Sequence, residues 1–206
     1  MIAIADNRLR DSLTLLPERE EPYRLEAVYE LFKDRCRSEI VLQFDGGFLQ
    51  VRAEEEDDTI GFDFHSEEFE RSREHRSLVS LSDAEIKVLA QVARVPALKG
   101  QNGIPANVAG AAIRPGYGKH GGLLKRRLIS SRMIGRKVLY EITTSGRRAL
   151  ASAVWNKLIG KNCEWSWVAW SQQGYRDSIM LSFDGIVPTV LLSVCASSIE
   201  VFSIAG

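Results

Sequence analysis

The chain has 206 residues and a mass of 23.0 kDa, which suits one large domain or two small ones. Hydrophobic residues make up 45% of the chain, charged residues 26%, and the mean hydropathy is −0.13, so a disordered or fibrous protein is excluded. No apolar run approaches the ~20 residues that cross a bilayer, and the first residues lack the apolar core of a signal peptide. We therefore expect a cytoplasmic protein that does not bind membranes.

The charges are distributed unevenly, although the 27 basic and 27 acidic residues cancel overall. Between Lys99 and Arg148 there are eleven basic residues and a single acidic one, Glu141, which gives this segment a charge of +10. Between Glu54 and Glu74, ten acidic residues accompany only two basic ones. The middle of the chain is therefore the part suited to hold a polyanion.

Two β-rich stretches resemble each other. Ser38–Gly46 aligns with Asp177–Gly185 at an offset of 139 residues, and both alternate apolar and polar residues before an Asp-Gly turn. Leu25–Leu31 and Trp165–Trp170 coincide at the same offset and predict one further strand each, although a helix is an alternative for the first. We expect a duplicated β-unit with two four-stranded antiparallel halves, closed as a sandwich or a barrel. Chance similarity between short β meanders is the alternative.

The sequence between these halves is mostly helical in pattern. Ser82 and Glu85 form a Ser-x-x-Glu capping box, which predicts the start of an amphipathic helix that ends near Val95-Pro96. The segments expected to follow are helices at 105–112 and 119–130, a hairpin that turns at Gly135-Arg136, and a helix at 143–159.

This order of elements resembles the winged helix-turn-helix regulators, especially the MarR-like and PadR-like kinds. The similarity lies in Leu128–Ile134, the short basic wing after it, Tyr140–Thr143 and Gly146-Arg147. The resemblance implies a third helix that enters the major groove of DNA and a wing that reaches the backbone or the minor groove. Two departures are a very short wing and the pair Gly121-Gly122, which weakens the third helix by roughly 1 kcal/mol per glycine.

The predicted fold class is thus α+β, with a winged-helix domain inserted between two similar four-stranded halves. The predicted domains are a first β half at 1–64, an acidic linker at 65–79, the winged-helix insert at 80–160 and a second β half at 161–206. The predicted function is a sequence-specific regulator of transcription that binds double-stranded DNA as a homodimer and acts by occupying a promoter. Its expected DNA-binding residues are Arg114, Lys119, His120, Lys125, Arg126, Arg127, Arg132, Arg136 and Lys137.

Two other functions stay open at this point. The insert could dock a protein or RNA inside a multisubunit defence or mobile-element complex, or the chain could be an inhibitor or immunity protein that uses its acidic loop. The β halves serve dimerisation, sensing or partner docking, and Trp165, Trp167 and Trp170 are expected in the core or at a dimer interface. The expected partner or ligand residues are Glu54, Glu55, Glu56, Asp57 and Asp58 of the acidic loop, and Gln172, Gln173 and Tyr175. The last three belong to a Gln-Gln-Gly-Tyr-Arg-Asp stretch that faintly resembles small uncharacterised bacterial β-domains.

Catalytic chemistry has little support in the sequence. No nucleophile-elbow, Walker or dinucleotide-binding fingerprint is found, and His65, His75 and His120 lack metal-ligand spacing. The three cysteines show no CxxC spacing and are expected to be buried thiols. We therefore expect no enzyme activity, no cofactor and no metal.

Overall fold

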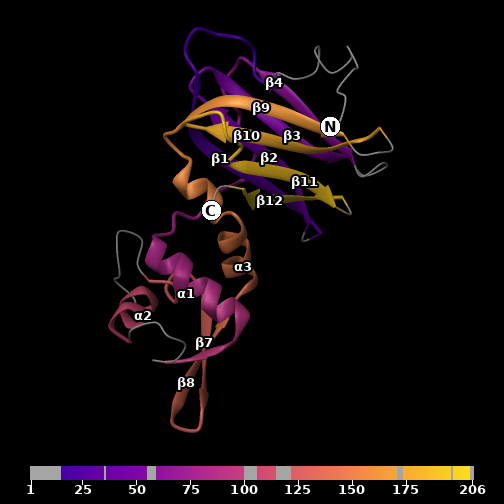
Figure 1. Cartoon of the computed structure of the whole chain (residues 1–206). Helices are drawn as coiled ribbons and strands as arrows, with labels where there is room; N and C mark the ends of the chain where they lie inside the picture. The colour runs from indigo at the N-terminus through magenta and orange to yellow at the C-terminus, as the bar shows by residue number, and fades with distance from the viewer. Residues whose placement is uncertain are drawn as a thin grey trace, which may run out of the picture. The chain divides into compact units, whose positions relative to one another are not determined.

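The structure is a computed structural model of the chain, which divides into two compact units (Figure 1). Met1–Leu78 and Lys157–Gly206 form the first, called here the sheet unit, and Val79–Asn156 forms the second, the insert unit. The structure describes residues 15–34, 36–54, 59–99, 106–114, 122–170, 174–195 and 197–204, with the backbone alone for 106–109.

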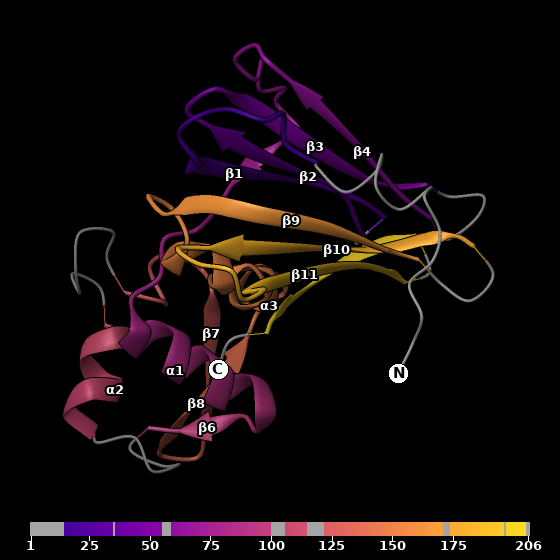
Figure 2. The same ribbon diagram turned by 45° about the horizontal axis from the view of Figure 1, so that its top comes forward.

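Over its described residues, the sheet unit is a single antiparallel sheet of nine strands. Its main path runs in the order β12-β11-β10-β9-β1-β2-β3-β4, and β5 pairs with β1 at Tyr29 and Glu30. Figure 2 shows the two ends of this path as two layers that meet where β1 lies beside β9. The strands are β1 (Tyr23–Lys33), β2 (Cys36–Phe44), β3 (Gly47–Glu54), β4 (Thr59–His65), β5 (Arg76–Ser77), β9 (Asn162–Trp170), β10 (Arg176–Phe183), β11 (Val190–Cys195) and β12 (Ser198–Ser203).

The core of the sheet unit lies between the two layers. Strand β12 packs against β2 and β3, while β4 packs against β10 and β11. Apolar side chains at alternate positions fill the interface, as expected for strands with one buried face. Residues related by the 139-residue offset are buried in pairs: Ile40 and Ile179, Leu42 and Leu181, Phe44 and Phe183, Val51 and Val190, and Ile60 and Ile199.

The aspartate of each Asp-Gly turn forms a hydrogen bond with the backbone of β1 or β9, the first strand of its half of the sheet. Asp45 accepts a hydrogen bond from the backbone N–H of Arg24 (3.2 Å), and Asp184 accepts one from that of Asn162 (3.1 Å). Asp184 is also ion-paired with Lys161 at 2.9 Å. The bond from Lys161, followed by the backbone bond from Asn162, lowers the pKa of the Asp184 carboxyl.

The insert unit has three α-helices among its described residues and a small sheet in the order β6-β8-β7. Its core consists of the buried side of α1, through Val88, Leu89 and Val92, packed with Leu123, Tyr140 and other apolar residues. The elements are α1 (Asp83–Arg94), β6 (Ala97–Leu98), α2 (Ala106–Ile113), β7 (Ile129–Ile134), β8 (Lys137–Ile142), α3 (Thr144–Ala151) and a 3-10 helix (Ala153–Lys157), whose last residue already belongs to the sheet unit.

The predicted fold class is wrong. In the part of the chain that the structure describes, strand outweighs helix at 49% against 18%, and the strands expected to form two halves belong to one continuous sheet. The helix expected over 119–130 is also absent from its described part, where residues 123–127 form turns and a strand begins at Ile129. A winged helix between two β halves therefore does not describe this structure.

Local backbone constraints explain why no recognition helix forms over the described residues. Gly122 lies so close to the end of α2 that an added Cβ would sit 1.9 Å from the carbonyl oxygen of Arg114. Arg127 has a φ of 56°, which is outside the right-handed helical region. The low helix propensity of Gly121-Gly122 also disfavours a helix here. Packing against the end of α2 therefore outweighs the helical spacing of the apolar residues.

Two other expectations are met only in part. Trp165 and Trp170 are 52% and 47% exposed, which excludes the core for these two side chains and leaves the dimer interface a prediction. Cys36 and Cys195 are exposed, and only Cys163 is a buried thiol. Among the described residues, no helix has the length and apolarity to cross a bilayer.

The close approach of α3 to the preceding segment predicts an asymmetric response to adding one methyl group. An added Cβ at Gly146 would lie 1.9 Å from the carbonyl oxygen of Leu128, so Gly146→Ala should lower the free energy of unfolding by about 1–3 kcal/mol. Gly110, within α2, has no atom within 4 Å of its added Cβ, and Gly110→Ala should instead raise that free energy by about 0.5–1 kcal/mol. Urea unfolding measures both; equal effects would contradict the packing described.

Candidate nucleic-acid interface

The charge of the chain is divided between the two units. The insert unit contains 13 basic and 3 acidic residues, and the sheet unit contains 14 basic and 24 acidic residues. The two units therefore carry net charges of +10 and −10. The insert unit is therefore strongly positive although the whole chain is neutral. The positions of its three acidic residues determine how much of its positive charge is left unpaired at the surface.

The three acidic residues of the insert unit are all placed within its own structure. Asp83 lies in the first turn of α1, where a negative charge is favourable near the helix N-terminus. Glu85 pairs with Arg126, and Glu141 pairs with Arg132 at 2.8 Å. Two of the predicted DNA contacts are thus neutralised by carboxylates of the same unit.

The Glu85–Arg126 pair is a buried structural tie. Oε2 of Glu85 accepts hydrogen bonds from the backbone N–H (2.9 Å) and the hydroxyl (3.2 Å) of Ser82, which completes the capping box expected from the sequence. Arg126 contacts Oε1 of Glu85 and donates to the carbonyl oxygen of Ser80 at 2.7 Å. Because the side chains are only 7% and 14% exposed, Arg126 joins its turn to α1, and we leave it out of the candidate interface.

Most of the remaining basic residues face solvent without an ionic partner. Within the described part of the insert unit, nine exposed basic side chains make no ion pair, and they lie on several elements. They are Lys87 and Arg94 of α1, Lys99 after β6, Arg114 after α2, Lys125 and Arg127 of the turn, Arg136 and Lys137 of the hairpin, and Arg147 of α3.

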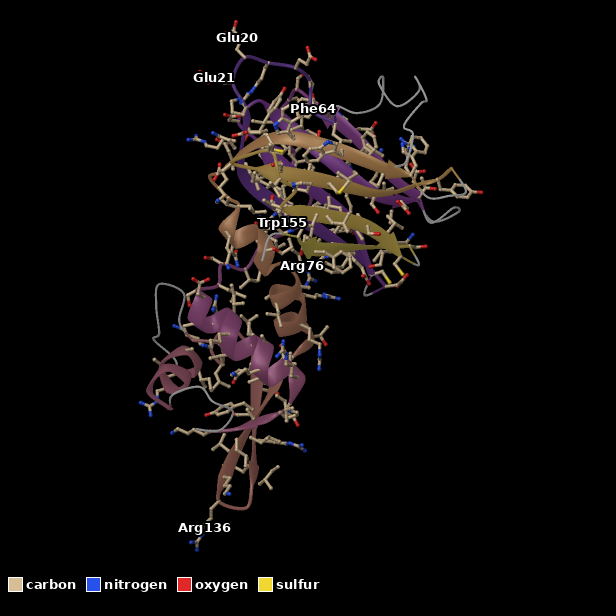
Figure 3. The ribbon with its side chains drawn as sticks, viewed as in Figure 1. Glu20, Glu21, Phe64, Arg76, Arg136 and Trp155 are labelled. Atoms are coloured by element: carbon tan, nitrogen blue, oxygen red, sulfur yellow. The ribbon has the colours of Figure 1, made fainter. Side chains whose placement is uncertain are left out.

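Strands β7 and β8 form a hairpin whose end extends beyond β6. Strand β6 pairs with β8 only at Ala97–Tyr140 and Leu98–Leu139, so the last pairs, Met133–Val138 and Ile134–Lys137, form a two-stranded ribbon. Gly135 opens the turn with a φ of 58°, which suits glycine. Figure 3 shows Arg136 pointing outward at the end of this ribbon.

The ribbon end combines positive charge with exposed apolar side chains. Met133 and Ile134 are 64% and 52% exposed. Lys99 lies on the other side of β8, where its backbone N–H donates to the carbonyl oxygen of Val138 at 3.3 Å. We call Lys99, Met133, Ile134, Arg136 and Lys137 the hairpin tip.

A second basic group lies at the other end of β7. Thr143 donates through its hydroxyl to the carbonyl oxygen of Arg127 (2.7 Å) and accepts, at its own carbonyl oxygen, the backbone N–H of Arg147 (2.9 Å). Lys125 is two residues from Arg127 in the same turn. The six residues of β7, an extended strand about 20 Å long, run from this group to the turn that holds Arg136 and Lys137.

The predicted interface residues have different positions in the structure. Lys119 and His120 lie outside the described residues. Arg114, Lys125, Arg127, Arg136 and Lys137 are exposed, whereas Arg126 and Arg132 are paired as above. Sequence reasoning left out Lys99 and Arg147, although both belong to the same basic segment. Their proximity to the hairpin and to the turn depends on strand pairing and capping contacts that a count of charges does not include.

The predicted partner residues belong to the sheet unit. Tyr175 is 48% exposed before β10, and Glu54 is exposed at the end of β3. Gln172 and Gln173, as well as Glu55, Glu56, Asp57 and Asp58, lie outside the described residues. The partner role of these residues stays a prediction.

The described residues contain no group of three or more side chains arranged to hold a metal ion. Burial raises the pKa of the Cys163 thiol to about 12, which keeps it protonated and unreactive near neutral pH. Nδ1 of His75 shares a hydrogen bond with the hydroxyl of Ser72 (2.6 Å), and Nε2 of the same ring contacts Oε1 of Glu39 (2.7 Å). This chain of contacts ties the segment before β5 to β2.

Comparisons with known proteins give little further information. Residues 138–206 match a family of unknown function (DUF6334), which is one third of the chain and includes β8, α3 and β9–β12. No curated protein and no solved structure matches the chain.

The buried Glu85–Arg126 ion pair predicts that Arg126 is needed for stability and that its neighbour Arg127 is not. Arg126→Ala leaves the buried carboxylate of Glu85 unpaired and should lower the free energy of unfolding by about 3 kcal/mol. Arg127→Ala removes an exposed charge and should change it by less than about 0.5 kcal/mol. Chemical unfolding of both variants tests this; an Arg126→Ala variant as stable as the parent would show that the pair is not structural.

Proposed function

We propose that the chain is a non-catalytic DNA-binding protein, whose insert unit binds duplex DNA and regulates transcription by occupying its site. The observation that carries this proposal is the set of nine exposed basic side chains in a unit whose carboxylates Glu85 and Glu141 are already used internally. A body of net charge +10 attracts a polyanion over distances of about a Debye length, ~10 Å at 0.1 M salt. DNA phosphates supply the countercharge that the unit lacks.

The hairpin tip fits a groove of the duplex. A two-stranded ribbon can enter the major groove, which is about 12 Å wide. Arg136 and Lys137 would contact phosphates or base edges there, and Met133 and Ile134 would make apolar contacts with thymine methyl groups. The basic group of Lys125, Arg127 and Arg147 would then lie about 20 Å away, along the phosphate backbone. This mechanism uses the ribbon and needs no recognition helix.

A second candidate function is protein docking through the same tip. The specific observation in its favour is the exposure of Met133 and Ile134, because large apolar side chains at a protruding surface are common at protein interfaces. An acidic partner would satisfy the surrounding positive charge. Binding that persists after nuclease treatment would favour this candidate over DNA binding.

Titration of a labelled duplex of about 20 base pairs, at several salt concentrations, tests DNA binding. If seven exposed basic residues contact phosphates, the logarithm of affinity should fall with the logarithm of salt concentration at a slope of about −6. Arg136→Ala combined with Lys137→Ala should make this slope shallower by about 2 and weaken binding about tenfold near 0.1 M salt.

The matched control is Arg73→Ala combined with Lys157→Ala, which removes the same charge from exposed positions of the sheet unit. It should leave DNA affinity within about twofold of the parent, because neither side chain belongs to the proposed interface of the insert unit. A parent protein with no salt-dependent affinity, or equal losses in the two double variants, would contradict the proposal.

A further inference from the structure

The sheet unit contains an aromatic groove that the DNA-binding proposal does not use. Its volume is about 480 Å³, and it lies between the segment before β1 and the first half of β9. Leu16, Tyr23, Trp165 and Trp167 are among the apolar residues that line it. Of these, Trp165 is 52% exposed, so a large aromatic surface faces solvent at the groove.

The two tryptophans form a parallel pair. They are two residues apart on β9, which places both side chains on the same face of the strand. Their ring centroids are 6.5 Å apart and their planes differ by 16°. Rings held in this way offer flat, electron-rich faces to a ligand, and such faces attract cations, with tryptophan the strongest of the aromatic side chains.

Negative charge surrounds the aromatic wall. Glu18, Glu21 and Glu164 line the groove, are exposed, and make no ion pair with any described residue. Figure 3 shows Glu21 on the segment that leads into β1. Arg19 is the one basic side chain of the lining, and its guanidinium is already bound to Asp45 at 2.7 Å. The charge of the groove is therefore complementary to a cationic ligand.

The same unit already holds guanidinium groups on aromatic rings. Arg19 lies over the ring of Tyr23 at 3.9 Å from the centroid and also donates to the carbonyl oxygen of Pro22. Arg176 lies over Phe62 at 5.3 Å. An arginine from a partner protein would stack on the exposed ring of Trp165 through the same kind of interaction.

One wall of the groove is an edge of β9. Strand β9 pairs with β1 only at Arg24–Asn162 and Tyr23–Cys163, and among the described residues its backbone has no strand partner on that side from Glu164 onward. The segment before β1 contacts this edge through a hydrogen bond from the backbone N–H of Leu15 to the hydroxyl of Ser166 (3.2 Å). Open strand edges accept extended peptides through main-chain hydrogen bonds. An extended segment along this edge would present its side chains to both tryptophans.

We propose that this groove binds an arginine-bearing, basic peptide segment of a partner protein. Trp165 and Trp167 stack on a guanidinium, and Glu18, Glu21 and Glu164 provide the countercharge. Arginine is favoured over lysine because its planar, weakly hydrated group stacks on aromatic faces. Nucleic acid is disfavoured, because the sheet unit carries a net charge of −10.

The test uses the full chain and three end-capped synthetic peptides with one alternating Gly-Xaa sequence, in which Xaa is arginine, lysine or citrulline. Calorimetry should show the arginine peptide binding most tightly and the lysine peptide about threefold or more weaker. The uncharged citrulline peptide should not bind detectably. Equal affinity for arginine and lysine peptides, or no binding of either, would overturn the proposal without requiring any variant.

Variants then locate the site. Trp165→Ala should weaken the arginine peptide about tenfold. The matched control Trp170→Ala, an equally exposed tryptophan on the same strand but outside the groove lining, should bind as the parent does. Glu21→Gln with Glu164→Gln should weaken binding at low salt, whereas Glu67→Gln with Glu68→Gln should not. Equal losses in the groove and control variants would place binding elsewhere and overturn the proposal.

Discussion

Repulsion between like charges constrains both units of this chain. Thirteen basic side chains share the insert unit with three acidic ones, and the sheet unit has the opposite excess. Each unit folds by burying apolar residues, but the charged residues at its surface outnumber the residues of opposite charge that could pair with them. The two proposed activities follow from this constraint, because each unit is complementary to a ligand of opposite charge: DNA for the insert unit and a basic peptide for the sheet unit.

Within the insert unit, the scarce carboxylates are used where they contribute most to structure. Glu85 completes the cap of α1 and holds Arg126 of the following turn, so one buried side chain joins two segments that are far apart in sequence. This use of Glu85 has a consequence for binding, since it withdraws Arg126 from the surface. The basic residues of the hairpin tip and around Thr143 remain exposed, because no carboxylate of the described insert unit pairs with them.

Local signals in the sequence predicted local structure well. Asp-Gly pairs and two-residue alternation indicated strands now seen as β2 and β10, and the Ser82–Glu85 pattern indicated the cap of α1. Features set by distant contacts could not be read in this way. The helix expected near residue 119 depended on apolar spacing alone, but Gly122 packs against the backbone of Arg114 and its neighbours form turns. Likewise, nothing local shows that Arg126 is buried by Glu85 or that Trp165 remains exposed.

The central claim is that duplex DNA covers the unpaired basic residues of the insert unit. Lysine acetylation of the full chain, with and without DNA and read by mass spectrometry, measures this directly. The account predicts that DNA protects Lys99, Lys125 and Lys137 and leaves Lys157 of the sheet unit as reactive as before. Equal labelling of all four lysines with and without DNA would contradict it.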